Sequence, residues 1–191
     1  MMKNNKETRM LNIEFKAVDN EEDKMIIEGY AIIFNNAATH YGMTEIIDPK
    51  ALDNCDMSDV PLKYNHDDSH LLMARTRNGS LQLTVDNIGL KFKADLIDTQ
   101  SNRDIYKSII AGLLDKCSFA FTTKSDSYDY DTDTRTILEI DKLFDVSVVD
   151  VPFYDATSVY ARKLDTSEEY FKAKQAEKLA KAKQELLNKL G

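Results

Sequence analysis

The hydrophobic period of the chain changes within residues 112–121, and this change limits the possible folds more than any other feature. Over residues 105–113, apolar side chains recur every four positions, which is typical of one face of a helix. Gly112 can adopt the positive φ at which helices often end. Over residues 117–121, bulky side chains instead alternate with Ser118 and Ala120, as they do in a buried strand. A helix is therefore expected to run directly into a strand that carries a hydroxyl group.

Alternating apolar runs dominate the rest of the first 151 residues. We expect strands at 11–17, 25–34, 60–64, 71–77, 81–85, 90–97, 117–121 and 136–151. Asn78-Gly79 and Asp86-Asn87-Ile88-Gly89 are turn signals between three of them. Helices are expected only at 48–52, where Asp48 precedes a proline, and after a cap at Thr99 or Ser101. The pattern predicts a mainly β protein of the α+β class, an antiparallel barrel or sandwich with helices packed outside, and excludes a doubly wound parallel sheet.

The composition changes near residue 164, and this predicts a tail. Residues 168–190 contain no Gly or Pro and are rich in Ala, Lys, Glu and Leu, which is typical of a helix with a thin apolar stripe. The expected layout is a flexible N-terminus at 1–10, one domain at 11–163 and a helical tail at 164–191. The tail is either a solvated helix or a docking helix for a larger partner.

The charge and the cysteine content exclude several classes of protein. A net charge of -8 argues against a nucleic-acid or anionic-membrane partner. No apolar run is long enough to cross a membrane, and no signal peptide is apparent, so we expect the chain to remain inside the cell. The two cysteines are expected to be free thiols rather than zinc ligands.

Neither a cofactor nor a metal ion is expected from the motifs. The chain has no glycine-rich phosphate loop and no dinucleotide fingerprint. Asp129, Asp131 and Asp133 resemble the first ligands of a calcium loop, but Thr134 replaces the glycine that such a loop needs. Ile140 also stands where the closing glutamate belongs. An acidic hairpin tip is the favoured interpretation.

A serine nucleophile needs a general base, and histidine is the usual one near neutral pH. The chain has three histidines. His66 follows a buried-looking strand, whereas His40 lies in a polar loop and His70 in a solvated turn. His66 is therefore the favoured base for Ser118.

Such a base also needs a carboxylate to orient it. Asp145 stands alone in the apolar run 143–149, so it must be paired or hydrogen-bonded to offset its desolvation. Glu139 and Asp141 fit the solvent side of a hairpin better, and Asp150 fits a strand end. Because Glu139, Asp141 and His70 remain alternatives, the third catalytic member is left open at this point.

Several short motifs follow one another along the chain. They are Glu28-Gly29-Tyr30-Ala31 with Phe34, Asn65-His66-Asp67, Gly89-Leu90, Gly112-Leu113 before Cys117-Ser118-Phe119-Ala120-Phe121, and Phe144-Asp145-Val146-Ser147-Val148-Val149-Asp150-Val151-Pro152. In this order and spacing, the chain resembles the prohead serine proteases of tailed phages over residues 11–162.

The resemblance implies a fold and an activity. The fold would be an assemblin-like β-barrel wrapped by helices, as in herpesvirus proteases. The activity would be that of a serine endopeptidase that acts in the assembling prohead, in the host cytoplasm. It would cut scaffold or the scaffold-like segment of the major capsid protein, and often itself. Assemblin relatives form dimers, so self-association is a further expectation.

Residue by residue, the resemblance matches Ser118 to the nucleophile, His66 to the general base and Asp145 to the third member. The neighbouring Cys117 is a rival nucleophile, but alternation would turn it to the other side of the sheet. Oxyanion donors are expected among backbone amides near Ser118, with Arg75 or Arg77 as side-chain alternatives.

A second function stays open beside the protease. A capsid-assembly or scaffolding factor could keep the protease fold and act through the helical tail. The presence of both Ser118 and His66 favours the active enzyme.

Overall fold

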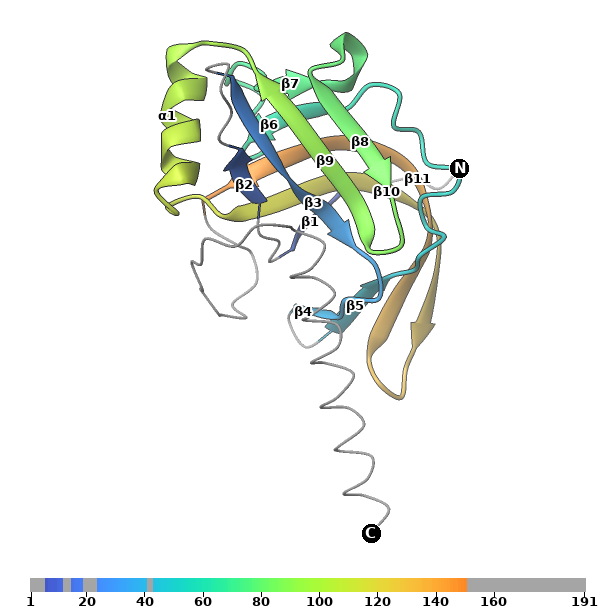
Figure 1. Ribbon diagram of the computed structural model, residues 1–191. Helices are drawn as coiled ribbons and strands as arrows, with labels where there is room; N and C mark the ends of the chain where they lie inside the picture. The colour runs from blue at the N-terminus through green and yellow to red at the C-terminus, as the bar shows by residue number, and fades with distance from the viewer. Residues whose placement is uncertain (1–5, 12–14, 19–23, 41–42, 151–191) are drawn as a thin grey trace. The chain divides into compact units, whose positions relative to one another are not determined.

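The computed structural model describes residues 6–11, 15–18, 24–40 and 43–150, which form two β-sheets and an α-helix (Figure 1). The strands are β1 (Glu7–Leu11), β2 (Phe15–Val18), β3 (Met25–Ile33), β4 (Ala38–His40), β5 (Met43–Ile47), β6 (Pro61–Tyr64), β7 (Ala74–Arg75), β8 (Leu81–Val85), β9 (Gly89–Leu96), β10 (Lys116–Asp129) and β11 (Thr134–Val149). The helices are η1 (Thr76–Asn78), a 3-10 turn, and α1 (Gln100–Ile110).

The larger sheet is built around the long hairpin of β10 and β11. Its order is β1-β10-β11-β5-β4, and β6 also pairs with β11 and with β7. β10 and β11 are antiparallel, whereas β5 and β6 each run parallel to a different part of β11. β11 is thus the central strand, and β1 lies at the edge beside β10.

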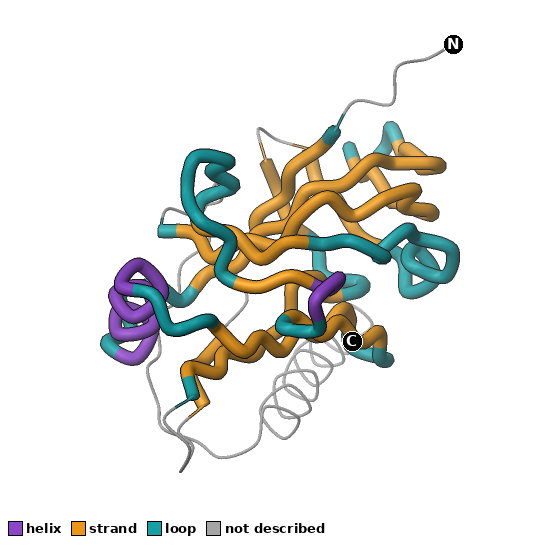
Figure 2. Tube along the Cα trace, turned by 90° about the horizontal axis from the view of Figure 1, so that it is seen from above, coloured by secondary structure: helices purple, strands orange, loops and turns teal. Residues whose placement is uncertain are grey.

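The smaller sheet has the order β2-β3-β9-β8, with every pair antiparallel. Its strand β3 contacts β10 of the larger sheet. Fully buried side chains of both sheets form the core between them, among them Ile27 and Phe92 from the smaller sheet and Phe119 and Phe121 from the larger. Figure 2 shows α1 beside these strands rather than between them.

The prediction of a mainly β, α+β fold is confirmed, but the described residues form no closed barrel. The expected helix at 48–52 is wrong. The chain instead makes successive turns there, in which Asp48 accepts hydrogen bonds from the amides of Lys50 and Ala51. Asp before Pro is also a turn signal, and the turns satisfy the same backbone groups that a short helix would.

The second expected helix is present as α1, with Thr99 as its cap. The Thr99 hydroxyl accepts from the amide of Asn102 at 3.2 Å, and Gly112 has the expected positive φ of 71°. However, the helix ends at Ile110, and Leu113 lies beyond it with 75% of its surface exposed. The apolar period therefore overstated the length of the helix.

Two strand pairings differ from the expectation. The predicted strand 11–17 is replaced by β1, which pairs with β10, and β2, which pairs with β3. Asn78-Gly79 ends the η1 turn and is not a hairpin, because β7 pairs with β6 and β8 with β9. Asp86–Gly89 does form the expected hairpin, between β8 and β9.

The two ends of the chain compare differently with the predicted layout. The expected flexible N-terminus, 1–10, overlaps β1, because residues from Glu7 onward pair with β10. The expected helical tail, 164–191, lies outside the described residues.

Gly89 lies where two backbones approach too closely for any side chain. A Cβ at this position would lie 1.9 Å from the carbonyl oxygen of Ile32 on β3. The contact is with backbone, so it cannot be relieved by rotating a side chain. Gly79, by contrast, has a positive φ of 77° but open space around it.

We therefore expect Gly89→Ala to lower the free energy of unfolding by about 3 kcal/mol, because the added methyl must push β3 and β9 apart. Gly79→Ala is the matched control and should cost about 1 kcal/mol, the cost of its left-handed backbone. Urea unfolding of both variants measures this. Equal losses in the two variants would contradict the steric explanation.

Four charged side chains form an ion-pair cluster between β1, β5 and β11. Arg9 pairs with Glu45 and also with Glu7 at 2.6 Å, and Arg135 pairs with Glu7 at 2.6 Å and with Glu45 at 3.1 Å. Desolvation would raise the pKa of Glu7, but hydrogen bonds from Arg135 and Thr123 and the charges of both arginines lower it to about 2. The cluster fastens the edge strand β1 to the rest of the larger sheet.

Because the folded pKa of Glu7 lies below its ordinary value of 4.5, its ionisation stabilises the fold above about pH 4.5, and this stabilisation is lost as the pH falls toward 2. Glu7→Gln should cost about 1–2 kcal/mol at pH 7 and much less at pH 3. Urea unfolding at both pH values tests this, and an equal cost at both would contradict it.

Candidate active site

The segment after β6 carries His66 to the C-terminal end of β11. β6 runs parallel to β11, and beyond it the amide of Asn65 donates to the carbonyl of Val148 at 2.8 Å. The Asn65 side chain in turn accepts from the amide of Asp150 at 3.1 Å. Asn65 and His66 both have positive φ, 52° and 56°. Such a backbone is uncommon for residues other than glycine, although Asn and His adopt it more readily than most.

The register between β10 and β11 sets which side chains share a face with His66. Ser118 is directly opposite Ser147, and Ala120 is directly opposite Asp145. Paired residues of neighbouring strands point to the same side of a sheet. Ser118, Ser147 and Asp145 therefore lie on one face, while Cys117 and Phe119 point to the other.

Three of the predicted site residues form one continuous chain of hydrogen bonds. The His66 Nδ1 atom lies 2.5 Å from Oδ1 of Asp145, and its Nε2 atom lies 2.6 Å from Oγ of Ser118. Asp145 and Ser118 are fully buried, and His66 keeps 16% of its side-chain surface exposed. This is the geometry that a hydroxyl, a base and an orienting carboxylate require.

Ser147 is a further member that the sequence analysis did not single out. Its Oγ atom lies 3.0 Å from Oδ1 of Asp145 and 3.1 Å from Nδ1 of His66, and the residue is fully buried. A signal was present, because Ser147 is two residues from Asp145 and so must share its face of the strand. A small hydroxyl in an apolar strand is easily taken for a core residue.

The Asp145 carboxylate is stabilised in its charged form despite its burial. Desolvation would raise its pKa, but the hydrogen bond and charge of His66, the charge of Lys6 and the hydroxyl of Ser147 outweigh this and lower the pKa. Lys6 Nζ lies 3.2 Å from Oδ2 of Asp145, and Lys63 Nζ lies 3.9 Å from it. Asp145 thus remains ionised and able to hold a protonated imidazole.

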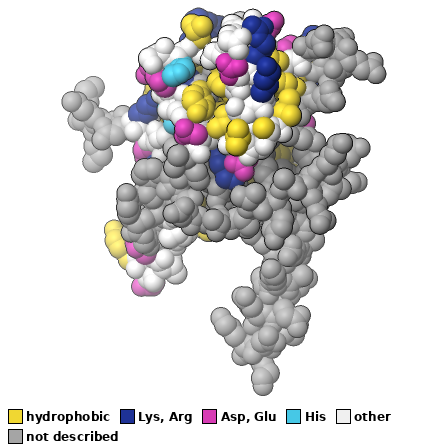
Figure 3. Space-filling model, turned by 90° about the vertical axis from the view of Figure 1, so that its left-hand side faces the viewer, with side chains coloured by type: hydrophobic (Ala, Val, Ile, Leu, Met, Phe, Trp, Pro, Cys, Tyr) yellow, Lys and Arg dark blue, Asp and Glu magenta, His cyan; other side chains and the backbone are white. Residues whose placement is uncertain are grey.

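The alternative third members lie elsewhere. His70 is exposed and pairs with Asp67 at 2.7 Å, and Glu139 pairs with Lys124 at 2.8 Å. Asp141 is exposed, and the side chain of His40 lies outside the described residues. Figure 3 shows the face of the molecule on the side of α1, where the histidine side chains (cyan) lie next to acidic side chains (magenta).

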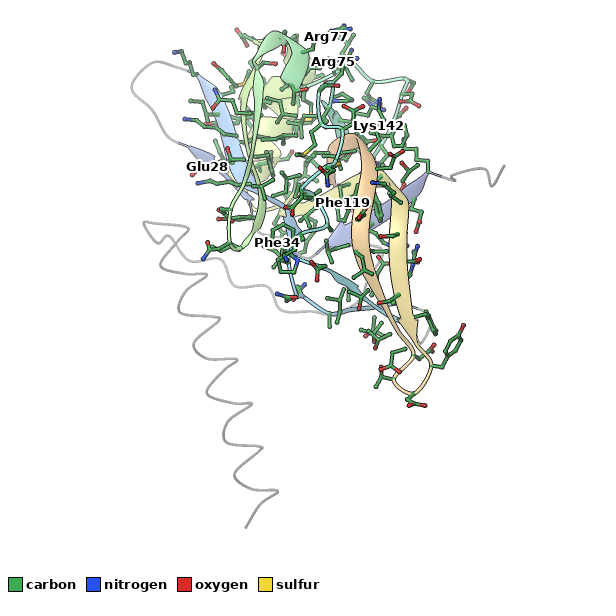
Figure 4. All side chains as sticks on the ribbon, turned by 90° about the vertical axis from the view of Figure 1, so that its right-hand side faces the viewer. Glu28, Phe34, Arg75, Arg77, Phe119 and Lys142 are labelled. Atoms are coloured by element: carbon green, nitrogen blue, oxygen red, sulfur yellow. The ribbon has the colours of Figure 1, made fainter. Side chains whose placement is uncertain are left out.

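The rival nucleophile and the candidate oxyanion arginines are also kept apart from the site. Cys117 is fully buried, and desolvation raises the pKa of its thiol to about 12, so it stays protonated. Arg75 and Arg77 both pair with Asp59, Arg75 through two hydrogen bonds. Figure 4 shows both arginines at one end of the molecule, away from Phe119, the residue next to Ser118.

Within the described ranges, no group of three or more His, Cys, Asp or Glu residues could hold a metal ion. Asp129–Asp133 forms the turn between β10 and β11, as expected of an acidic hairpin tip. The described helices include none that is long and apolar enough to cross a membrane.

Comparisons with known proteins identify one family. The model of the caudovirus prohead serine proteases matches residues 11–170, which include Ser118, His66 and Asp145. A search of curated proteins and a search of solved structures each gave no match. Because the family model covers most of the sequence, the chain belongs to the caudovirus prohead serine protease family.

Proposed function

We propose that the chain is an active serine endopeptidase of phage head maturation, with Ser118 as nucleophile, His66 as general base and Asp145 as the group that orients His66. The observation that carries this proposal is the unbroken hydrogen-bond chain from Asp145 through His66 to the Ser118 hydroxyl. Family membership supports the class of enzyme, and the geometry supports the roles.

In the first half of the reaction, Ser118 Oγ attacks the scissile carbonyl carbon while His66 Nε2 takes the hydroxyl proton. Asp145 holds the Nδ1 proton of His66 and balances the charge of the imidazolium. When the tetrahedral intermediate collapses, His66 gives its proton to the leaving amine, and an acyl-enzyme on Ser118 remains. In the second half, His66 deprotonates a water molecule that attacks the ester carbon. His66 then gives this proton to Oγ of Ser118 as the Oγ–acyl bond breaks and the carboxylic acid product leaves.

Ser147 and Lys63 would support this chain without touching the substrate. The Ser147 hydroxyl lies within hydrogen-bond distance of both Asp145 and His66, and thus limits how the two can rotate. Lys63 Nζ, 3.9 Å from Asp145, favours the charged carboxylate. Groups of this kind usually contribute by positioning the reacting side chains.

The proposed substrates are the scaffold and the scaffold-like segment of the major capsid protein, cut inside the assembling prohead, with self-cleavage and dimer formation as further proposals. An assemblin-like relationship is part of the same proposal. Its support is the resemblance of the sequence motifs, together with a mainly β fold. The tail at 164–191 is proposed as the part that docks the enzyme onto scaffold.

We expect Ser118→Ala to abolish cleavage, since removing the nucleophile leaves only residual catalysis several orders of magnitude weaker. Intact-mass analysis of each protein, incubated alone and then with the matching capsid protein, measures this and locates the cut sites. Ser125→Ala, also on β10, is the matched control, and Cys117→Ala tests the rival thiol. Both should keep cleaving. If cleavage persists in Ser118→Ala, the assignment of the nucleophile is wrong.

We expect Ser147→Ala to lower kcat about 10-fold with little change in KM, because a buried hydrogen bond to an ionised group is lost. Ser147 is one of the groups that lower the pKa of Asp145, and it also holds His66 in place. Steady-state kinetics with a capsid-protein peptide measures kcat and KM separately. A rise in KM with an unchanged kcat would contradict the positioning role.

A further inference from the structure

The Ser118 hydroxyl has two acceptors but only one proton. Its Oγ atom lies 2.6 Å from Nε2 of His66 and 2.7 Å from the carbonyl oxygen of Arg9, to which it donates. A proton donated to the Arg9 carbonyl is not donated to His66. In this arrangement, the backbone of β1 competes with the general base for the proton whose removal makes Ser118 a nucleophile.

The position of β1 explains this contact. β1 pairs antiparallel with β10, and Met10 is directly opposite Ser118. Within the described residues, β10 is the neighbour of β1 in the sheet, so β1 is an edge strand. A carbonyl of an extended segment thus lies beside a fully buried nucleophile, where the carbonyl of a substrate would have to lie.

The same segment also contacts the other end of the hydrogen-bond chain. Lys6, just before β1, reaches Asp145 with its ammonium group at 3.2 Å, while Asp145 Oδ1 holds His66. An ammonium group at this distance offsets part of the negative charge that Asp145 offers to an imidazolium. The residues from Lys6 to Arg9 therefore engage both the nucleophile and the orienting carboxylate.

We propose that β1, together with Lys6, is an intramolecular strap that withholds activity, and that an extended substrate segment pairs with β10 in its place. This inference rests on the proposed function. An exposed sheet edge is a template for an added strand, which would hydrogen-bond to β10 through its backbone. The exchange costs little in backbone hydrogen bonds because one strand replaces another.

The fastening of the strap is charged, so single charges can be removed to test it. Arg9 and Glu7 hold β1 through Arg135 and the buried Glu45, next to the core side chain of Phe121. Salt screens ion pairs buried to this degree only weakly, so a substitution is needed to weaken them. A variant that weakens this fastening should therefore loosen the strap and activate the enzyme.

The register offers a direct way to lock the strap. Leu11 is directly opposite Cys117, so Leu11→Cys places a second thiol beside a native one at a separation that a disulfide can span. The oxidised Leu11→Cys protein should cleave the capsid protein at least 10-fold more slowly than the wild type. Reduction should restore the rate. Intact mass confirms the bond, and Leu11→Cys/Cys117→Ala, which cannot form it, is the matched control.

A second variant pair tests the strap without any disulfide. Arg135→Gln removes one fastening charge and should raise the initial cleavage rate several-fold, although it makes the protein less stable. Arg103→Gln removes an ion pair with Asp98 beside α1 and should leave the rate unchanged. A purely structural role of β1 would lower the rate in Arg135→Gln, and that result would overturn the strap.

The two proposals fail in different ways. If the wild type and Ser118→Ala are equally unable to cleave, the proposed function is wrong and the strap falls with it. If the wild type cleaves through Ser118 but the oxidised Leu11→Cys protein cleaves equally fast, only the strap is wrong. Redox-dependent cleavage by Leu11→Cys, absent from the Cys117→Ala control, supports the strap.

Discussion

The site depends on one buried charge, the carboxylate of Asp145, and on the strand register that places it. An isolated carboxylate in the interior would be very costly, and here it is offset by His66, Ser147 and Lys6. β10 and β11 supply the framework, because their pairing sets Ser118 opposite Ser147, one step along the same face from Asp145. A shift of this register by one residue would turn either the serine or the aspartate into the apolar core.

Much of this arrangement could be predicted from local patterns. The alternation at 117–121 predicted a strand in which the side chains of Ser118 and Cys117 point to opposite faces. The apolar run around Asp145 predicted that its carboxylate is paired or hydrogen-bonded. Both features concern a residue and its immediate neighbours, which is where periodicity is informative. His66 was favoured as the base because it follows a buried-looking strand, but its combination with Asp145 came from the resemblance to the family.

The other features of the fold and the site depend on pairings between segments that are distant in the sequence. Nothing local indicates that residues 7–11 join β10 while 15–18 join β3, because the first segment is mostly polar and the second belonged to the single strand expected at 11–17. The turns at 48–52 and the exposed Leu113 show the same limit in helices, since cap signals and short periods also occur in turns. Ser147 was missed because its role exists only beside His66.

The placement of β1 also bears on how a protease of this kind can be made in a cell without damaging its surroundings. A hydrogen-bond chain from Asp145 to Ser118 is complete within the fold, so assembling these groups cannot by itself be the control step. In the strap proposal, control acts instead on substrate access and on the acceptor of the Ser118 proton, and the Arg9 carbonyl affects both. An edge strand is suited to such control because its release leaves β10 and β11 paired, and so the carboxylate, the base and the nucleophile keep their positions.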